Sequence, residues 1–409
     1  MKRKRALSLL LSAAMILVCT SCTTGTGGQK EQSETVSFSV FDPDLSQGIV
    51  ELPPVEQIKK GPAPVPKSTE ENMKVYRADE TAVRFFGRTY QNGDIRMMTW
   101  TASGFDLLFT GTKLEISFFA TKVNDDINRP MIGVFLDNYN DPEKMIVVPV
   151  DKAMEYITVL DGLEDTTHYV KIFKMSENNT APLGVMDIRT DGQLEGAPEA
   201  LFDRRIEFIG DSITSGFGIL APKADSAFKT SEENGAMTYA ALTARNLNAE
   251  YNVLSISGWA LYKSWAAQGS AYLDIPPIYR YTDYTYQKEM LWDFSAFQPH
   301  AVVVNLGTND SAYLKDHPDE YADFVKAGAD FFRDIRTKNP DAAIVVCYGM
   351  MGLEMTDYLK QAVEKSGLEN IHYIGLRNLR TARALHPSPA DHQANAELLT
   401  AELRKILNW

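Results

Sequence analysis

The chain has 409 residues, which is long for one compact domain and favours two domains once a leader is removed. Its composition is that of a globular enzyme, with 44% hydrophobic, 10% aromatic and 23% charged residues. A formal net charge of −13 argues against binding nucleic acid or an anionic membrane surface through a general basic field, and a neutral substrate fits it better.

Residues 1–22 predict an export signal of the lipoprotein kind. Lys2–Arg5 form a basic region, and Ala6–Val18 form an apolar stretch too short to span a bilayer comfortably. The following residues, Cys19 to Cys22, resemble a bacterial lipobox with Cys22 as the acylated first residue, although Cys19 stands where Leu is usual. We therefore expect an extracytoplasmic, membrane-anchored lipoprotein, at the cell surface or facing the periplasm. An ordinary cleaved signal is the alternative.

Residues 23–70 predict a disordered, Pro-rich tether. They show little periodic apolar pattern, and Pro53-Pro54 and the run 61–66 favour an extended, stiff chain. After cleavage two cysteines remain, Cys22 and Cys347. Because Cys347 lies in the apolar run Ala342–Cys347, we expect a buried, inert thiol and no cysteine-based metal site.

Residues 71–198 predict an antiparallel β-sandwich of the jelly-roll kind. Short alternating or apolar runs follow one another, separated by turn residues and without a helical pattern. The clearest of these runs are Leu107–Phe109, Lys113–Phe118, Ile132–Asp137 and Tyr169–Lys174.

Residues 199–409 predict a second domain, a three-layer α/β/α fold with a parallel sheet. Strand and helix patterns alternate, and near-continuous apolar strands indicate a sheet covered on both faces. In such a sheet the active site lies beyond the carboxyl ends of the strands. The predicted strands are Ile206–Ile209, Asn252–Ile256, Ala301–Leu306, Ala343–Tyr348 and Ile371–Leu376, and the main predicted helices are Met237–Leu247, Glu320–Lys338, Met355–Lys365 and Asp391–Leu407.

Three of these strands end in polar loops suited to acyl transfer. The loops are Gly210–Gly216, Ser257–Trp259 and Gly307–Asp310, and His386 stands just before the last helix. Blocks that contribute Ser, Gly, Asn and His in this order resemble the SGNH (GDSL-like) hydrolase superfamily.

The resemblance implies a catalytic role for each of four residues. Ser212 is the nucleophile and His386 its general base, because a serine hydroxyl needs a nearby imidazole to take its proton. The oxyanion hole is formed by the backbone N–H groups of Ser212 and Gly258 and by the side-chain amide of Asn309.

A second resemblance, to carbohydrate esterase family 2, covers roughly Arg84–Trp409. That family places a β-sandwich before the SGNH domain. The resemblance implies an O-acetyl esterase that acts on polysaccharides or oligosaccharides of the hemicellulose type through an acyl-serine intermediate. The features that carry it are Phe86–Arg88, Phe109–Thr112, Phe135–Asp137, His168–Lys171, Arg205–Ser212 and the pattern of His386, Pro387 and Ser388 followed by His392.

No carboxylate stands where SGNH enzymes usually carry one. The positions two and three residues before His386 are Ala384 and Arg383. As in some members of family 2, we expect a Ser-His dyad with the imidazole held by a backbone carbonyl. Asp391 is the alternative partner, but capping of the last helix already explains it.

Other residues near the loops have simpler explanations. His317 and His392 are expected to be structural, and Asp211 to hold its turn. Three aromatic residues, Trp259, Trp265 and Tyr313, are candidates for stacking on sugar rings, although aromatic residues are also common in cores.

The leading hypothesis is therefore an esterase that needs no metal ion or cofactor. Its expected partner is an acetylated carbohydrate substrate, and no nucleic acid is expected to bind. Contact with a membrane is expected only through the N-terminal lipid anchor. One alternative is an inactive carbohydrate-binding or sensing lipoprotein, because the usual Asp is missing. Another is an SGNH esterase that acts on an envelope glycan or a lipid ester.

Overall fold

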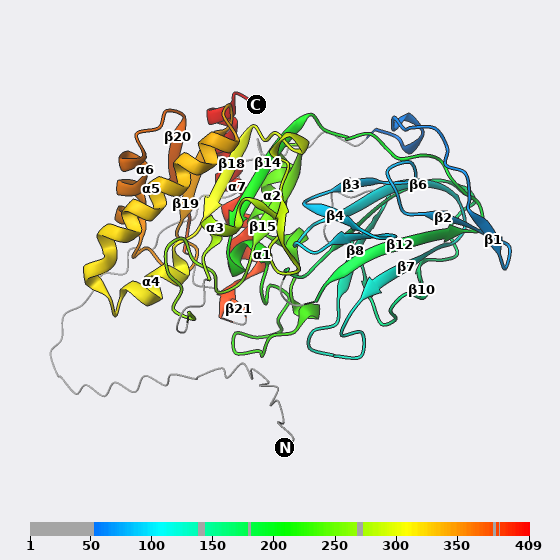
Figure 1. Cartoon of the computed structure of the whole chain (residues 1–409), viewed down its shortest axis with the longest axis horizontal. Coiled ribbons are helices and arrows are strands. Elements are labelled where there is room, and N and C mark those ends of the chain that lie inside the picture. Colours follow the sequence, from blue (N-terminus) through cyan, green and yellow to red (C-terminus); the bar gives the residue numbers. More distant parts are fainter. Residues whose placement is uncertain (1–52, 138–143, 179–180, 268–272, 379–381, 384) are drawn as a thin grey trace, which may run out of the picture. The chain divides into compact units, whose positions relative to one another are not determined.

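The computed structural model describes residues 53–137, 144–178, 181–267, 273–378, 382–383 and 385–409. The predicted signal, Cys22, most of the predicted tether and Ala384 lie outside the described residues. Two β-sheets packed face to face come first along the chain, and a parallel sheet with helices follows (Figure 1). This is the predicted fold class, a β-sandwich followed by an α/β domain.

The β-sandwich consists of two antiparallel sheets. The seven-stranded sheet contains β1 (Ser68–Glu70), β2 (Met73–Arg77), β4 (Thr89–Asn92), β5 (Ile95–Met98), β7 (Leu114–Ala120), β10 (Tyr156–Leu160) and β12 (Leu183–Thr190). The six-stranded sheet contains β3 (Arg84–Phe86), β6 (Gly104–Gly111), β8 (Met131–Leu136), β9 (Ile146–Pro149), β11 (Thr166–Lys174) and β13 (Gln193–Leu194).

Alternating apolar side chains fill the space between the two sheets. On β6, Phe105, Leu107 and Phe109 point into this core, while Asp106 between them belongs to the other face. On β7 of the opposite sheet, Ile116 and Phe118 point into the same core. Every second side chain of these strands therefore faces the core, as the alternating apolar residues in the sequence predict.

The tether predicted for residues 23–70 is too long at its carboxyl end. Val55–Gln57 form a 3₁₀ turn, Ile58 is buried, and Ser68–Glu70 pair with β2. The N–H of Gly61 donates to the carbonyl oxygen of Ala197 at 2.9 Å. A Pro-rich, non-periodic segment can still lie along a sandwich when its backbone finds partners there, and its sequence pattern does not reveal this.

The second domain is built on a five-stranded parallel sheet in the order β15-β14-β18-β19-β20. The chain enters at β14 (Arg204–Gly210), moves outward to β15 (Ala249–Ser255), and then crosses to β18 (Ala301–Asn305), β19 (Ala343–Tyr348) and β20 (Ile371–Gly375). The order therefore reverses at β14, and sheets of this kind bind their ligands beyond the carboxyl ends of the strands at such a reversal, here those of β14 and β18. All five strands agree with the predicted ranges to within three residues at each end.

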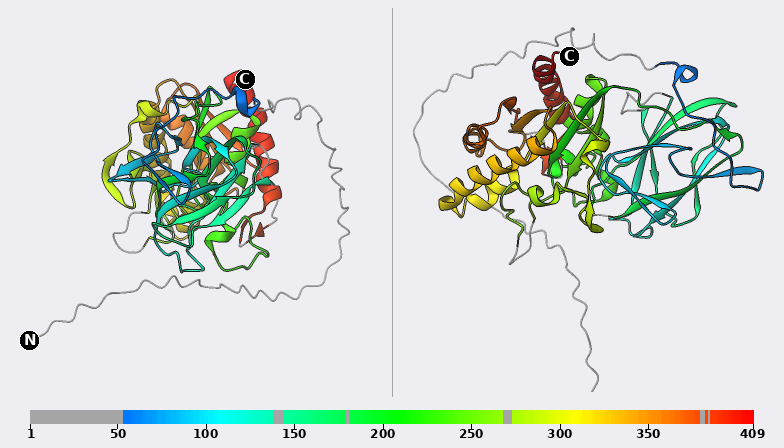
Figure 2. Two further views of the ribbon diagram at one scale, coloured as in Figure 1. Left: turned by 90° about the vertical axis from the view of Figure 1, so that its right-hand side faces the viewer. Right: turned by 45° about the horizontal axis from the view of Figure 1, so that its top comes forward.

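Helices cover both faces of this sheet. Apolar residues of α5 and α6 pack on one face and those of α2 and α7 on the other, as the views in Figure 1 and Figure 2 show. Cys347 of β19 is buried, as predicted, and burial raises the pKa of its thiol. The helices are α1 (Ser212–Ser215), α2 (Tyr239–Asn246), α3 (Ile275–Ile278), α4 (Thr308–Leu314), α5 (Tyr321–Lys338), α6 (Thr356–Ser366) and α7 (Pro389–Leu407).

Two short hairpins complete the second domain. The hairpins pair β16 (Tyr281–Asp283) with β17 (Gln287–Leu291), and β21 (Ala382–Arg383) with β22 (His386–Pro387). Throughout the described ranges, every helix is too short or too polar to cross a bilayer.

A buried arginine joins the two domains. Arg88 of the sandwich is 1% exposed, and it donates hydrogen bonds to the carbonyl oxygens of Tyr279 and Tyr281 at 2.6 and 2.8 Å. It also pairs with Glu207 of β14 at 3.0 Å. Because this charge is paired and hydrogen-bonded inside the interface, its removal would leave the Glu207 carboxylate buried and unbalanced.

Candidate active site

Ser212 lies directly beyond the carboxyl end of β14, as the first residue of α1. Gly210 precedes this turn, and a Cβ there would come within 2.0 Å of the Thr214 hydroxyl. Asp211 caps the helix, because its carboxylate accepts the N–H of Ile213 at 3.0 Å. The structural role predicted for Asp211 is confirmed.

The structure brings Ser212 and His386 together. The Nε2 atom of His386 lies 2.8 Å from the Oγ atom of Ser212, within hydrogen-bond reach. Ser212 is 6% exposed and His386 is partly buried, so surrounding residues shield the pair from most of the solvent. A nucleophile and a base in this arrangement can transfer a proton.

The imidazole of His386 also has aromatic neighbours that sequence reasoning missed. The ring of Phe217 lies 4.6 Å from it, centroid to centroid, and Phe228 stacks on Phe217 at 4.5 Å. The N–H of Leu385 donates to the carbonyl oxygen of Ala224 at 2.7 Å, which ties the histidine segment to the same loop. The only sequence signal was the place of Phe217, five residues after Ser212.

The other two candidate histidines lie in structural positions. His392 is 1% exposed, and its Nδ1 accepts the N–H of Tyr239 at 3.0 Å. Burial lowers the pKa of His392 to about 3, so it stays neutral. His317 is exposed and stacks on Tyr313.

Asp391 forms the capping box of α7. One of its carboxylate oxygens accepts both the N–H of Ser388 at 2.8 Å and the hydroxyl of Ser388 at 3.0 Å. The predicted capping role is confirmed.

The three predicted oxyanion donors converge on the same strand ends. Among the hydrogen bonds of the described residues, none uses the backbone N–H of Ser212 or of Gly258. Gly258 has φ +79°, and a Cβ there would meet nothing within 4 Å, so it borders open space. Left-handed backbone of this kind favours glycine. Both N–H groups are thus available to an oxyanion.

Asn309 is oriented by a tryptophan. The indole N–H of Trp265 donates to the Oδ1 atom of Asn309 at 3.0 Å. Since an indole N–H only donates, this contact fixes which end of the amide is nitrogen. The Nδ2 atom donates to the carbonyl oxygen of Trp259 at 2.8 Å and lies 3.3 Å from the carboxylate of Asp211. To donate to an oxyanion, the Nδ2 atom of Asn309 must therefore release its 3.3 Å hydrogen bond to Asp211.

The aromatic stacking candidates differ in exposure. Trp265 is 61% exposed and keeps an open ring. Trp259 is 9% exposed and meets Tyr284 edge to face in the core, so it lacks the open ring face that stacking requires. Tyr313 is partly buried, with its ring against His317 and its hydroxyl donating to Glu320 at 3.1 Å. Of the three, Trp265 alone combines an open face with a contact to a site residue.

Two buried carboxyl groups support the loops. Asp310 accepts the N–H groups of Leu261, Tyr262 and Lys263 at 2.9, 2.7 and 3.1 Å and so holds the segment after Gly258. Burial raises the pKa of Asp310 to about 6 and that of Asp211 to about 7, the latter also because Asp310 is near. Burial and the repulsion between the two carboxylates therefore disfavour their ionised forms, whereas the hydrogen bonds from backbone N–H groups stabilise those forms.

A cavity of about 570 Å³ opens beside His386. Its exposed apolar side chains are Met351, Leu353 and Leu385, and Glu354 supplies a carboxylate. Its size lies in the range of small-ligand pockets.

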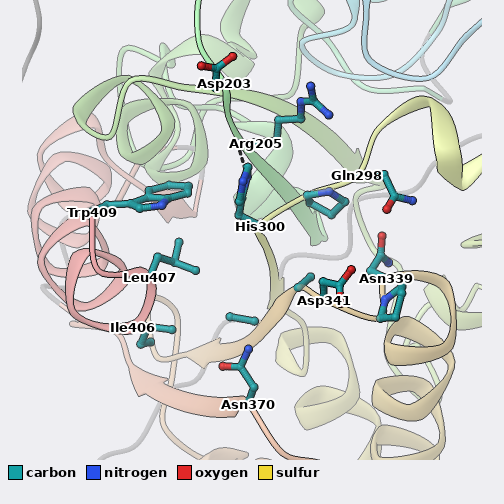
Figure 3. Close-up of a pocket in the computed structure, with 14 residues that line it drawn as sticks. Asp203, Arg205, Gln298, His300, Asn339, Asp341, Asn370, Ile406, Leu407 and Trp409 are labelled. Carbon is teal, nitrogen blue, oxygen red and sulfur yellow. Dashed lines mark hydrogen bonds between the residues drawn. The ribbon is translucent and has the colours of Figure 1, made fainter.

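A second cavity, of about 580 Å³, lies at the opposite edge of the sheet, at the amino ends of the strands. Figure 3 shows Arg205, His300 and Trp409 gathered around it. The N–H of Arg205 donates to the Nδ1 atom of His300 at 3.2 Å. Because Arg205 begins β14 while Ser212 follows its end, this cavity belongs to a different part of the domain.

Within the part of the chain that the structure describes, no group of three or more His, Cys, Asp or Glu side chains could hold a metal ion.

Two family models match the chain, one in each domain. The model for the GDSL-like lipase/acylhydrolase family matches residues 208–394. The model for the N-terminal domain of carbohydrate esterase 2 matches residues 85–198. The four residues Ser212, Gly258, Asn309 and His386 all lie within the first match.

Known proteins resemble the chain across both domains. It is 31% identical to the cellulase/esterase CelE of Acetivibrio thermocellus over 74% of this chain, but it spans only 38% of that protein's length. It is 24% identical to an acetylxylan esterase/glucomannan deacetylase of Cellvibrio japonicus, over 81% of this chain and 91% of that protein. A family two carbohydrate esterase from Clostridium thermocellum, solved with cellohexaose, superposes with a TM-score of 0.70 at 28% identity, covering 80% of this chain and 99% of that one.

Proposed function

We propose that the chain is a carbohydrate O-acetyl esterase, in keeping with its matches to the models of the GDSL-like lipase/acylhydrolase family and of the N-terminal domain of carbohydrate esterase 2. The observation that carries the proposal is the 2.8 Å contact between His386 Nε2 and Ser212 Oγ. Next to it stand the backbone N–H groups of Ser212 and Gly258 and the amide of Asn309. Acyl transfer requires this combination of nucleophile, base and fixed donors.

The proposed reaction proceeds in two halves. Ser212 Oγ attacks the acetyl carbonyl carbon while its proton passes to His386 Nε2. The C–O bond to the sugar then breaks, and His386 gives the proton to the sugar oxygen, which leaves acetyl-Ser212. A water molecule attacks this ester and loses a proton to His386, and acetate departs as the proton returns to Ser212. The oxyanion donors stabilise the negative oxygen in both halves.

We propose that Ser212 and His386 act as a dyad. One oxygen of the carboxylate nearest in sequence, that of Asp391, is engaged by Ser388 at the start of α7. The face of Phe217 lies against the imidazole and restricts its rotation. Packing of this kind supports the ring without a negative charge.

The proposed substrate is an acetylated polysaccharide or oligosaccharide of the hemicellulose type. The cavity of about 570 Å³ beside His386 is large enough for sugar units, and the exposed ring of Trp265 lies beside Asn309 on another side of the site. The similarity to the acetylxylan esterase/glucomannan deacetylase supports this substrate class. The strongly negative chain also fits a neutral glycan better than an anionic ligand.

Acetate release tests the proposal directly. The wild-type protein should release acetate from acetylated xylan, acetylated glucomannan and p-nitrophenyl acetate. Ser212→Ala should lose this activity while its unfolding transition stays unchanged, because a small hydroxyl is removed. Turnover by Ser212→Ala within about tenfold of wild type would refute the nucleophile, since loss of this group normally costs several orders of magnitude. A folded wild-type protein that hydrolyses no acetyl ester would favour the carbohydrate-binding alternative.

We also propose that Cys22 carries a lipid anchor and that the protein is extracytoplasmic. The basic and apolar regions before Cys22 and the small residues beside it support this reading. Fractionation of a bacterial host should place the wild-type protein with the membranes and Cys22→Ala in the soluble fraction. A mature N-terminus elsewhere, without an acyl group, would contradict the anchor.

A further inference from the structure

The segment that follows β11 leaves the sandwich and is buried against the second domain. Lys174, the last residue of β11, is 0% exposed, and Glu177 of this segment is 3% exposed. Charged side chains are buried to this extent only when specific partners hold them. The neighbouring Asn178 donates to Thr99 at 3.1 Å and to Asp283 at 3.2 Å, and so fixes the end of the segment.

The carboxylate of Glu177 contacts two segments of the candidate active site. Its Oε2 atom accepts the backbone N–H of Ser257 at 2.5 Å and lies 3.5 Å from the hydroxyl of Ser215. Ser257 is the residue before Gly258, and Ser215 ends the helix that Ser212 begins. One oxygen of the sandwich domain thus touches both segments that carry backbone oxyanion donors.

A further contact joins these two segments to each other directly. The hydroxyl of Ser215 is 2.8 Å from the hydroxyl of Ser255, the last residue of β15. The N–H of Ser215 donates to the carbonyl oxygen of Asp211 at 3.0 Å. The helix that carries Ser212 and the strand end that leads to Gly258 are therefore linked to each other as well as to Glu177.

Neighbouring groups hold Glu177 in place. The Nζ atom of Lys174 donates to the carbonyl oxygens of Ser176 and Glu177 at 2.8 and 2.5 Å. The carboxyl of Glu233 accepts the N–H of Glu177 at 3.0 Å. Burial raises the pKa of Glu177 and raises that of Glu233 well above its usual value, while burial lowers the pKa of Lys174 to about 8 against the pull of these two carboxyl groups.

We propose that Glu177 is a positioning residue of the esterase reaction: by accepting the N–H of Ser257 and contacting Ser215, it sets the spacing between the oxyanion donors Ser212 and Gly258. The inference rests on the proposed function. Such donors stabilise an oxyanion only when they are held at about 2.7–3.1 Å from it, so their support matters as much as their presence. In this proposal the β-sandwich contributes a residue that positions the oxyanion donors of the active site.

The first test is Glu177→Gln, which keeps the size of the side chain and removes its charge. The neutral amide oxygen can still accept the N–H of Ser257 but binds it more weakly than a carboxylate does, so we expect kcat for p-nitrophenyl acetate to fall on the order of 10-fold. KM should stay unchanged, because the oxyanion exists only in the transition state. Hydrogen exchange of the Ser257 and Gly258 amides should become faster.

The matched control is Glu250→Gln. Glu250 is also a buried carboxylate at the domain interface, paired with Arg84 at 3.2 Å, but it lies at the amino end of β15, away from Ser257. Its kcat should stay within about twofold of wild type, even if the unfolding temperature falls. An equal loss of kcat in both variants would show that a looser interface is responsible, and it would overturn the positioning role.

If Glu177→Gln does not fold, a second variant, Glu177→Asp, provides the test. Glu177→Asp retains a carboxyl group but withdraws it by one methylene from the N–H of Ser257, and it should also lower kcat. Wild-type kcat in either folded Glu177 variant, or a change confined to KM, would overturn the inference. Unchanged hydrogen exchange of the Ser257 and Gly258 amides in Glu177→Gln would also overturn the inference, and this measurement does not depend on enzymatic activity. A folded wild-type protein that is inactive on acetyl esters would instead refute the proposed function.

Discussion

The ring of Phe217 lies against the imidazole of His386, with the ring centroids 4.6 Å apart and the planes inclined by 40°. Phe217 is itself backed by Phe228, whose ring is nearly parallel to it at 15°. In the proposed reaction His386 becomes an imidazolium, and an aromatic face within about 6 Å stabilises a cation. Phe217 can therefore contribute both to the orientation of the base and to its charged form.

Phe217→Leu tests this contribution. The substitution keeps an apolar side chain and removes the aromatic face, so kcat should fall by roughly 3- to 30-fold, as expected for a partly desolvated cation–π contact. KM should change little, because the imidazolium forms only during turnover. Steady-state kinetics on p-nitrophenyl acetate measure both constants. Phe228→Leu, which leaves the face of Phe217 in place, is the control and should cost less; equal losses would point to loop packing instead.

Asn309→Ala should lower kcat on the order of 10²- to 10³-fold, the usual cost of one oxyanion donor. Trp265→Phe is the informative partner, because it keeps an aromatic ring but removes the N–H that orients Asn309. We expect Trp265→Phe to lower kcat as well, by less than Asn309→Ala. If either substitution raised only KM, its residue would be assigned to sugar binding.

His386→Ala should abolish turnover, whereas Asp391→Asn should cost less than about tenfold in kcat, compared with about 10⁴ for the acid of a full triad. The physical reason is that one oxygen of Asp391 is engaged in capping α7. Asp391→Asn should instead reduce the free energy of unfolding, by about 1 kcal/mol for a weakened cap. Urea unfolding and kinetics on the same preparations separate the two effects. A loss of several orders of magnitude in kcat would reveal a triad with Asp391.

His392 should make the protein sensitive to acid. Its pKa is lowered by burial to about 3, whereas an unfolded histidine titrates near about 6.5. As the pH falls from about 6.5 towards 3, the unfolded chain gains a proton that the folded chain does not. The free energy of unfolding therefore falls with falling pH, by up to about 1.4 kcal/mol per pH unit from this residue.

The measurement is urea unfolding between neutral pH and pH 5, for the wild-type protein and His392→Asn. The asparagine oxygen can accept the N–H of Tyr239 in place of Nδ1. The variant should lose less stability on acidification, whatever its stability at neutral pH. Identical pH dependence in both proteins would remove His392 as the cause.

Strand periodicity and loop residues are local features, and they predicted most of this architecture. The five parallel strands were found because each is apolar throughout, and their polar ends identified Ser212, Gly258 and Asn309 as neighbours in space. The boundary of the tether was missed because the backbone pairing of Gly61 with Ala197 leaves no pattern in either segment.

The supporting contacts of the site could not be predicted in the same way. Trp259 and Trp265 look alike in sequence, but one is buried in the core and the other is 61% exposed, which depends on the packing of distant residues. Phe217 and Glu177 each contact a catalytic segment that a long stretch of chain separates from them. Only the folded structure brings these pairs together.

The hydrogen bond from Trp265 to Asn309 has a consequence for substrate length. The indole that fixes the amide is exposed to water, which competes for the same N–H and oxygen. A glycan long enough to cover Trp265 would exclude that water and hold the amide more firmly while the acetyl group reacts. We therefore expect longer oligosaccharides to be favoured through faster turnover rather than tighter binding, since energy from a remote sugar ring is spent on ordering the groups that react.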